Sequence, residues 1–216
     1  MTDRSSRPVI ERWGAPLNLA TTAVLAMHDR GQGAQEMRRF TQRVAEPRAA
    51  YFAPVAPEGL WFPGALTDPI EANQPDLDDA LEMVEAALTQ VTRSGFAPAR
   101  TVMLGFGQGA SVLAHHIVAA RFAYAGAVLL AGGYLGPRGT MAPAEGRWDG
   151  RPVFLGLAEA DPEVPMHRAE ETADALWLRG ADVELRVYPG TEHAINEDQT
   201  VATRRLLARV RGDLAA

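Results

Sequence analysis

The sequence predicts an α/β fold with a mostly parallel central sheet and helices on both faces, organised as a single domain over residues 1–216. Three observations support this prediction. Short aliphatic and β-branched runs recur along the chain, and they are nearly continuously apolar, as in strands buried on both faces of a parallel sheet. Segments with helical periodicity lie between these runs. Strand and helix patterns then alternate to the end of the chain, which is typical of α/β proteins.

Six segments have the pattern of strands. They are residues 21–29, 49–56, 100–106, 126–133, 151–160 and 182–190. Each run is closed by small or turn-forming residues, such as Gly132-Gly133 and Pro189-Gly190. Such closing residues are the usual punctuation between strands and the following elements.

Four segments have the pattern of helices. In residues 75–95, Leu77, Leu81, Val84 and Leu88 repeat at helical spacing, with acidic residues early and Gly95 as a stop signal. The other three are residues 108–122, 168–180 and 197–214. The segments 57–75 and 136–150 are rich in Pro and Gly, and we predict them to be irregular.

Composition narrows the classes of function. The formal net charge of −6 weighs against nucleic acid or an anionic membrane as partner. The absence of cysteine excludes disulfides, thiolate metal ligands and a cysteine nucleophile. The polar start is unlike a signal peptide, and no apolar run reaches the ~18 residues of a membrane span. We therefore expect a cytoplasmic protein without a membrane span, and the sequence is compatible with a homodimer.

Residues 105–109, GFGQG, have the frame of a nucleophile elbow, Gly-x-Ser-x-Gly, between a predicted strand and a predicted helix. Such an elbow holds its central residue at a sharp, strained turn, and here Gly107 replaces the serine. Glycine-rich turns also bind phosphates, but Ala110 breaks the dinucleotide spacing and the Lys-Ser/Thr of a P-loop is missing. We therefore do not expect nucleotide binding. Ser111, one helical turn later, is not expected to replace the missing hydroxyl.

Two further residues follow in a meaningful order. Asp161 lies in the loop after one predicted strand, and His193 lies in the loop after the next. Nucleophile, acid and histidine is the chain order of an α/β-hydrolase triad. Loops at the carboxyl ends of parallel strands meet at one edge of the sheet, so the three positions can converge. Asp161 before a proline is also a common turn former, but its order relative to His193 favours a catalytic pair.

Six segments in order carry a resemblance to a known family. They are AVLAMHDRGQGAQEM, LWFPGALTDPIEANQPDLDDALEMVEAAL, LGFGQGAS, LAGGYLGP, DPEVP and GTEHAINED. From about Trp13 to its end, the chain resembles the phospholipase/carboxylesterase branch of the α/β-hydrolases, which includes acyl-protein thioesterases. The resemblance implies an α/β-hydrolase domain over residues 1–216, with Gly107 at the nucleophile position, Asp161 as the acid and His193 as the base.

The resemblance also implies a binding site. The oxyanion hole would be formed by the backbone N–H groups of Arg30 and Gln108, which stabilise a tetrahedral intermediate in active relatives. Trp61, Phe62 and Val164 would line a pocket for a small-molecule ester, thioester or acyl-like ligand. No cofactor is implied.

The sequence departs from the family pattern at three places. Gly107 has no side chain, so no acyl-enzyme can form there. Asp29 follows His28 where the family has glycine, and Glu192 precedes His193 where glycine is usual. Asp tolerates the left-handed backbone that glycine would supply, and Glu192 can be a solvated loop carboxylate. The spacing of these acidic and histidine residues fits no known ligand pattern, so no metal site is expected.

Three departures in three separate loops favour natural divergence over a single engineered change. If Gly107 were an engineered change, the natural protein would be a serine hydrolase. As it stands, the chain is expected to hydrolyse esters very weakly or not at all. Two alternatives stay open. One is a non-catalytic ligand-binding homologue. The other is an acid–base enzyme that catalyses an elimination, isomerisation or cyclisation, with His193, held by Asp161, as its base. Asp29 or Glu192 would then be a second acid or base. Asp29 and Glu192 are also candidates for substrate binding.

Overall fold

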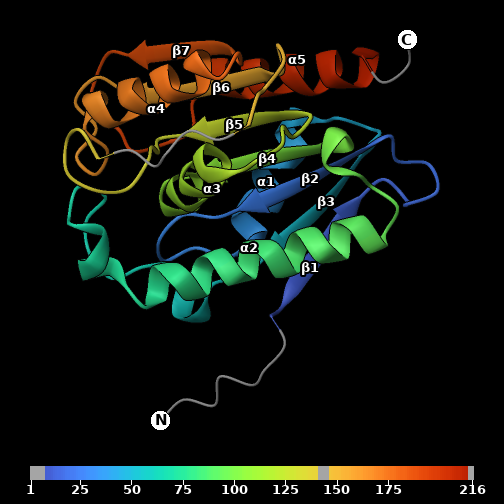
Figure 1. Cartoon of the computed structure of the whole chain (residues 1–216). Helices are drawn as coiled ribbons and strands as arrows, with labels where there is room; N and C mark the ends of the chain where they lie inside the picture. Colours follow the sequence, from blue (N-terminus) through green and yellow to red (C-terminus); the bar gives the residue numbers. More distant parts are fainter. Residues whose placement is uncertain (1–7, 141–145, 214–216) are drawn as a thin grey trace.

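The structure, a computed structural model, describes residues 8–140 and 146–213. Its strands form a single seven-stranded sheet in the order β1-β3-β2-β4-β5-β6-β7 (Figure 1). β1 is antiparallel to β3, and every other neighbouring pair is parallel. The strands are β1 (Ile10–Gly14), β2 (Thr22–Met27), β3 (Ala49–Pro54), β4 (Thr101–Phe106), β5 (Gly126–Leu130), β6 (Pro152–Ala158) and β7 (Asp182–Tyr188).

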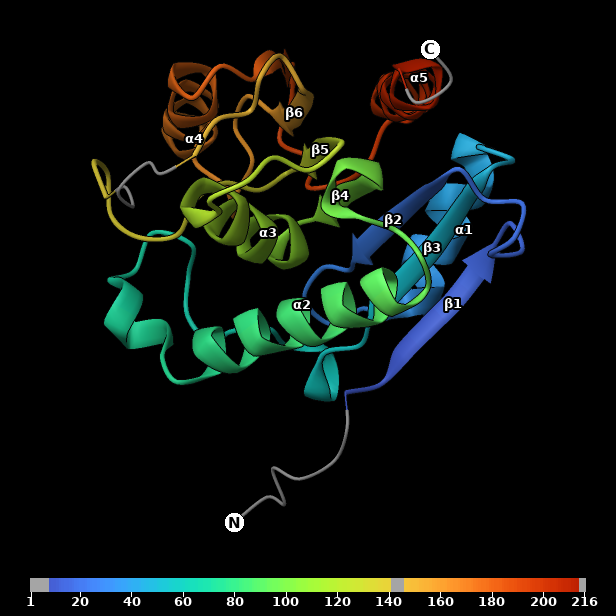
Figure 2. The same cartoon turned by 45° about the vertical axis from the view of Figure 1, so that its right-hand side comes forward.

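The helices cover both faces of this sheet, as Figure 2 shows. They are α1 (Ala34–Val44), α2 (Asp76–Arg93), α3 (Gln108–Ala119), α4 (Met166–Leu178) and α5 (Glu197–Asp213). One apolar core lies between the sheet and α2, α3 and α4, and a second lies between the sheet and α1 and α5. The predicted α/β fold with a mostly parallel sheet is therefore confirmed. Within the described ranges, none of the helices has the length and apolar character needed to cross a bilayer.

The six predicted strands and four predicted helices are all present within a few residues of their expected ends. Two elements were missed. β1 is a short antiparallel edge strand with a mixed burial pattern, so it lacks the apolar run used to find the others. α1 lies in a strongly charged segment, although Ala34, Met37, Phe40 and Val44 are buried at helical spacing and were the available signal.

One strand is less buried than its sequence suggested. β2 to β6 are buried throughout, but β7 lies at the edge of the sheet, and its residues are exposed or half-buried. The predicted irregular segment 57–75 contains two short 3-10 turns, Pro57–Gly59 and Ile70–Asn73, and no strand. In the other predicted irregular segment, residues 141–145 lie outside the described ranges.

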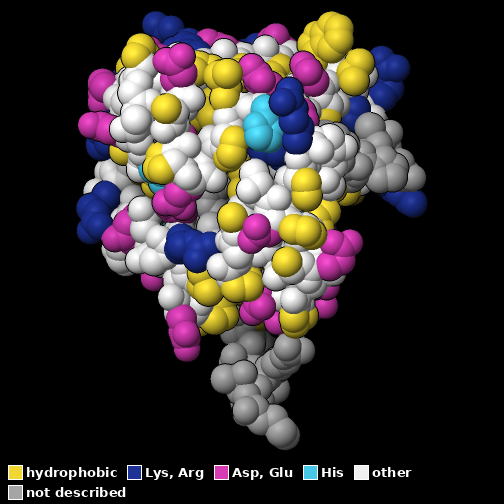
Figure 3. Space-filling model, turned by 90° about the vertical axis from the view of Figure 1, so that its left-hand side faces the viewer, with side chains coloured by type: hydrophobic (Ala, Val, Ile, Leu, Met, Phe, Trp, Pro, Cys, Tyr) yellow, Lys and Arg dark blue, Asp and Glu magenta, His cyan; other side chains and the backbone are white. Residues whose placement is uncertain are grey.

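The strand register determines where the loops meet. Met27 of β2 is paired with Gly105 of β4, and Ala158 of β6 with Tyr188 of β7. The loops after these parallel strands therefore leave from the same edge of the sheet, the side to which the arrow of β7 points in Figure 1. Figure 3 looks onto that side, where acidic and basic side chains are interspersed. This edge carries the candidate site.

Candidate active site

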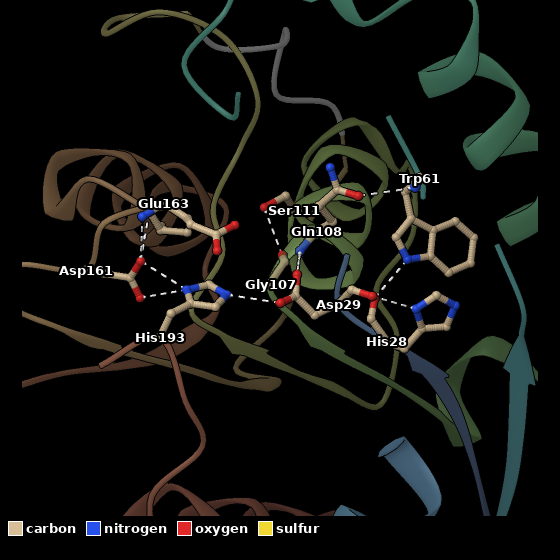
Figure 4. Close-up of polar contacts among 10 residues, drawn as sticks. His28, Asp29, Trp61, Gly107, Gln108, Ser111, Asp161, Glu163 and His193 are labelled. Atoms are coloured by element: carbon tan, nitrogen blue, oxygen red, sulfur yellow. Dashed lines mark hydrogen bonds and ion pairs between the residues drawn. The ribbon is translucent and has the colours of Figure 1, made fainter. Parts of the chain in front are cut away.

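The turn between β4 and α3 is a single residue, Gly107. Its backbone has φ 54° and ψ −122°, in the positive-φ region that side-chain-bearing residues rarely adopt. The Gly107 N–H donates to the carbonyl of Leu130 at 3.0 Å, which fixes the turn against β5. The buried Ser111 hydroxyl donates back to the carbonyl of Gly107 at 3.1 Å. Its hydrogen bond therefore lies within its own helix, as Figure 4 shows.

Gly109 lets the loop after β2 cross directly over the start of α3. A Cβ atom at Gly109 would overlap the backbone of Met27 and the carbonyl oxygen of His28. This close approach places residues 28–30 beside the first turn of the helix, where backbone N–H groups have no partner within the helix. The loop can therefore present a side chain to those N–H groups.

His28 is a structural residue of that loop. Its Nδ1 donates to the carbonyl of Asp29 at 2.7 Å, and its Nε2 accepts the Ala56 N–H at 3.1 Å, so one neutral tautomer satisfies both bonds. Burial lowers the pKa of His28. The indole of Trp61 donates to the carbonyl of His28 at 2.8 Å and packs against its ring. These contacts fix the backbone that carries Asp29.

The Asp29 carboxylate lies between the turn at Gly107 and His193 (Figure 4). Its Oδ1 accepts the backbone N–H of Gln108 at 2.8 Å, and its Oδ2 lies 3.2 Å from Nε2 of His193. Burial opposes ionisation, but hydrogen bonds from His193 and from the backbones of Gln108 and Arg30 outweigh it and lower the pKa of Asp29. The Gln108 N–H, which the family resemblance implied as an oxyanion donor, therefore donates to this carboxylate, and the Arg30 backbone contributes to the lowered pKa of Asp29.

The same carboxylate fills the space beside Gly107. A Cβ atom built on Gly107 would overlap both Oδ1 and Cγ of Asp29. No larger residue fits at position 107 unless Asp29 moves or is replaced. Asp29 and Gly107 thus form one local arrangement, in which the side chain of Asp29 takes the volume that a side chain at 107 would need.

Asp161 and His193 form a hydrogen-bonded pair. Nδ1 of His193 lies 2.9 Å from Oδ2 and 3.0 Å from Oδ1 of Asp161. The backbone N–H groups of Glu163 and Val164 also donate to Asp161, at 2.9 and 3.0 Å. Burial opposes ionisation of Asp161, but these bonds outweigh it and lower its pKa. The carboxylate is therefore ionised and held by its own loop.

His193 lies between two carboxylates, Asp161 at Nδ1 and Asp29 at Nε2. Burial alone would lower its pKa, but the hydrogen bonds to Asp161 and Asp29 outweigh it and raise the pKa to about 10. At neutral pH the ring is an imidazolium that donates from both nitrogens. Its ring also stacks on Phe106, with centroids 5.1 Å apart.

The predicted pocket residues are buried rather than open. Trp61 and Phe62 are each 2% exposed, and Val164 is 3% exposed. The Gln108 amide joins the first two to α3, because its Oε1 accepts the Trp61 N–H at 3.1 Å and its Nε2 donates to the Phe62 carbonyl at 2.8 Å. The Arg30 guanidinium continues this link, donating to the carbonyl of Gly64 at 2.7 Å.

Glu192 does not join the cluster. It is exposed, and among the described residues it has no hydrogen-bond or ion-pair partner. Nor does any set of three His, Asp or Glu side chains in the described ranges converge as metal ligands would. A cavity of about 310 Å³ reaches His193, and Phe106, Met37, Phe40 and Ile195 supply part of its apolar lining.

Sequence reasoning missed two features of the site. One is Phe106, whose ring supports His193; its place beside the glycine-rich turn was the available signal. The other is that the Asp29 carboxylate occupies the space beside Gly107 in which a side chain would lie. The available signal was the presence in one sequence of an acidic side chain at 29 and of glycine at 107.

Comparison with known proteins gives a consistent picture. The sequence model of the family described as Phospholipase/Carboxylesterase matches residues 15–209. A phospholipase/carboxylesterase structure from Dyadobacter fermentans DSM 18053 is 28% identical, with a TM-score of 0.88 over 94% of this chain and 97% of that one. No curated protein matches the sequence.

Two more distant structures share the fold. Esterase PE8 is 22% identical, with a TM-score of 0.78 over 95% of this chain and 100% of that one. The Bacillus cereus carboxylesterase is 18% identical, with a TM-score of 0.77 over 95% of this chain and 96% of that one.

Proposed function

The chain belongs to the phospholipase/carboxylesterase family of α/β-hydrolases, and we propose that it is a member whose serine-type ester hydrolysis is silent or very weak. In this proposal Gly107 holds the nucleophile position, Asp161 and His193 are the acid and base of the ancestral triad, and Arg30 and Gln108 supply the oxyanion hole. The observation that carries it is the Asp29 carboxylate, which overlaps the space of a side chain at 107 and accepts the Gln108 N–H.

Each part of the serine mechanism is affected. A serine hydrolase needs a hydroxyl nucleophile, a neutral histidine to take its proton, and free N–H donors for the oxyanion. Here the hydroxyl is absent, the histidine has its pKa raised to about 10, and the Gln108 N–H is occupied by Asp29. An acyl substrate would meet a site that already contains an anion.

The raised pKa of His193 also bears on the acid–base alternative. A general base must be deprotonated at the working pH. With its pKa near 10, His193 carries its proton at neutral pH and is an acid rather than a base while Asp29 is ionised. This speaks against proton abstraction by His193 in the resting site. Turnover of esters, thioesters or acyl-like ligands would need Asp29 displaced.

The test is hydrolysis of p-nitrophenyl butyrate by the chain and two variants. We expect no activity above background for the chain or for Gly107→Ser, because Asp29 keeps the serine from its place. The double variant Asp29→Gly/Gly107→Ser has space for serine, a free Gln108 N–H and a histidine with one carboxylate fewer. We expect its activity to exceed that of the chain by about 10³-fold or more. Ester turnover by the chain equal to that of the double variant would contradict the proposal.

A further inference from the structure

We infer that Asp29 is itself a covalent nucleophile, directed at saturated carbon atoms that bear a leaving group, such as those of primary alkyl halides. This activity goes beyond the silence towards esters proposed above, because it assigns a reaction to the carboxylate that blocks the serine mechanism. Carboxylates are established nucleophiles in covalent catalysis. The geometry around the two oxygens of Asp29 points to this role.

The two oxygens of Asp29 have different surroundings. Oδ1 faces the backbone N–H of Gln108 at 2.8 Å, and Oδ2 faces Nε2 of His193 at 3.2 Å. The side chains of Asp29 and His193 retain 8% and 11% exposure, so the pair is not sealed. Nδ1 of His193 lies in turn 2.9 Å from the second buried carboxylate, Asp161.

The first step forms an alkyl ester. A lone pair of Oδ2 attacks the saturated carbon, the O–C bond forms, and the C–X bond breaks as the halide leaves with its electron pair. No proton moves in this step. The carboxylate is ionised, since its pKa is lowered by its hydrogen bonds against the effect of burial. The cavity beside His193 is lined by apolar residues such as Phe106 and Ile195 and by the charged Glu36, Arg39 and Arg43, and Asp29 is not among its lining residues. An alkyl chain placed against the apolar residues would therefore reach Asp29 past the ring of His193.

The second step hydrolyses the ester at Cγ of Asp29. Esterification removes one of the two negative charges beside His193, so the imidazolium releases its proton to solvent and becomes a base. His193 then takes a proton from water as the water oxygen attacks Cγ. The oxyanion develops on Oδ1, where the Gln108 N–H already donates. Collapse breaks the Cγ–Oδ2 bond, and the alcohol leaves with the proton from His193. The remaining water proton passes from the new Asp29 carboxyl group to His193, which restores the carboxylate and the imidazolium, and the water oxygen stays in the Asp29 carboxylate.

The same geometry disfavours acyl substrates. Attack on an ester carbonyl would place a second oxyanion on the substrate, and that oxyanion would need hydrogen-bond donors of its own. The Gln108 N–H is directed to Oδ1 of Asp29. An alkyl substrate develops no carbonyl oxyanion in the first step. The inference therefore predicts alkyl rather than acyl specificity, and it agrees with silence towards p-nitrophenyl butyrate.

The experiment incubates the chain with a series of 1-bromoalkanes. Two quantities are measured: the bromide released and the mass of the intact chain. We expect bromide release by the chain, and a loss on the order of 10⁴-fold in Asp29→Asn. His193→Gln retains the first step but not the second, so it should accumulate one alkyl group on Asp29, located by peptide mass spectrometry. Turnover in ¹⁸O-labelled water should place ¹⁸O in the Asp29 carboxylate of the unsubstituted chain.

Exposed carboxylates report non-specific alkylation. Asp174 lies exposed on α4, and its peptide should stay unmodified under conditions that alkylate Asp29. Asp174→Asn should release bromide at the rate of the unsubstituted chain. The inference is overturned if His193→Gln carries no alkyl group, if the label is spread over exposed carboxylates, or if Asp29→Asn still releases bromide. None of these results depends on ester hydrolysis, which tests the proposed function separately.

Discussion

The pair Asp29 and Gly107 shows how two residues 78 positions apart in the chain share one volume. The carboxylate of Asp29 lies where a Cβ at 107 would have to be, and Gly107 has φ 54°, where a side chain is strained. The Asp29 carboxylate therefore fits only because residue 107 has no side chain. A serine introduced at 107 alone would meet both the backbone strain and the carboxylate.

This arrangement predicts a non-additive effect on stability. Gly107→Ser should lower the melting temperature, because the positive φ costs about 1–3 kcal/mol and the overlap with Asp29 adds to that cost. Adding Asp29→Gly should recover the part due to overlap, with a coupling free energy of about 0.5–3 kcal/mol in a double-mutant cycle. Thermal and denaturant unfolding of the four proteins measure it.

Gly95 provides the matched control. It has φ 94° but nothing within 4 Å of the position a Cβ would take. Gly95→Ser should therefore show the backbone cost alone. If Gly107→Ser destabilises no more than Gly95→Ser, or if Asp29→Gly brings no recovery, the shared volume is not the reason for glycine at 107.

At the scale of elements, the site depends on how closely the loop after β2 lies over the start of α3. The contact is made at Gly109, where a Cβ would overlap the carbonyl of His28. The sequence placed both elements correctly, since their apolar runs and glycine-rich junction are local signals. The distance between this loop and the start of α3 is not encoded by neighbouring residues in the sequence, because it depends on the pairing of Met27 with Gly105.

Gly109→Ala should therefore destabilise the fold, although alanine is normally the better helix former. Overpacking of this kind costs about 1–3 kcal/mol. The same substitution at Gly212, in the last turn of α5 with nothing within 4 Å, should be neutral or stabilising by a few tenths of a kcal/mol to about 1 kcal/mol. Chemical denaturation compares the two. If Gly109→Ala and Gly212→Ala change the free energy of unfolding equally, the loop after β2 moves to accommodate the added methyl group without a measurable cost.

At the scale of the whole molecule, the charges of the site affect stability across the pH range. His193 has its pKa raised from 6.5 to about 10, so its contribution is fully present below pH 6.5 and is lost as pH rises through about 10. Asp29 and Asp161 have lowered pKa values, so their contribution is present above about pH 3.8 and is lost as pH falls through their folded-state values.

Free energies of unfolding measured from pH 6 to pH 10.5 test the contribution of His193 to stability. We expect the chain to lose stability across this interval, and His193→Gln to show a smaller slope because it has no proton to lose there. The imidazole ¹⁵N shifts of His193 should also remain those of an imidazolium at pH 8. A neutral ring at pH 8, or equal slopes for the two proteins, would contradict the Asp29–His193–Asp161 arrangement.

Local apolar runs, turn residues and chain order were enough to predict the α/β class, six of the seven strands in the described residues, and the loops that bring Asp161 and His193 together. The contact of Asp29 with Gly107 and its hydrogen bond from the Gln108 N–H could not be predicted in this way and emerge from the packed fold. Local patterns encode which residues are buried and where strands end. The volume and hydrogen-bond donors that two loops share depend on strand register and on the distance between packed elements.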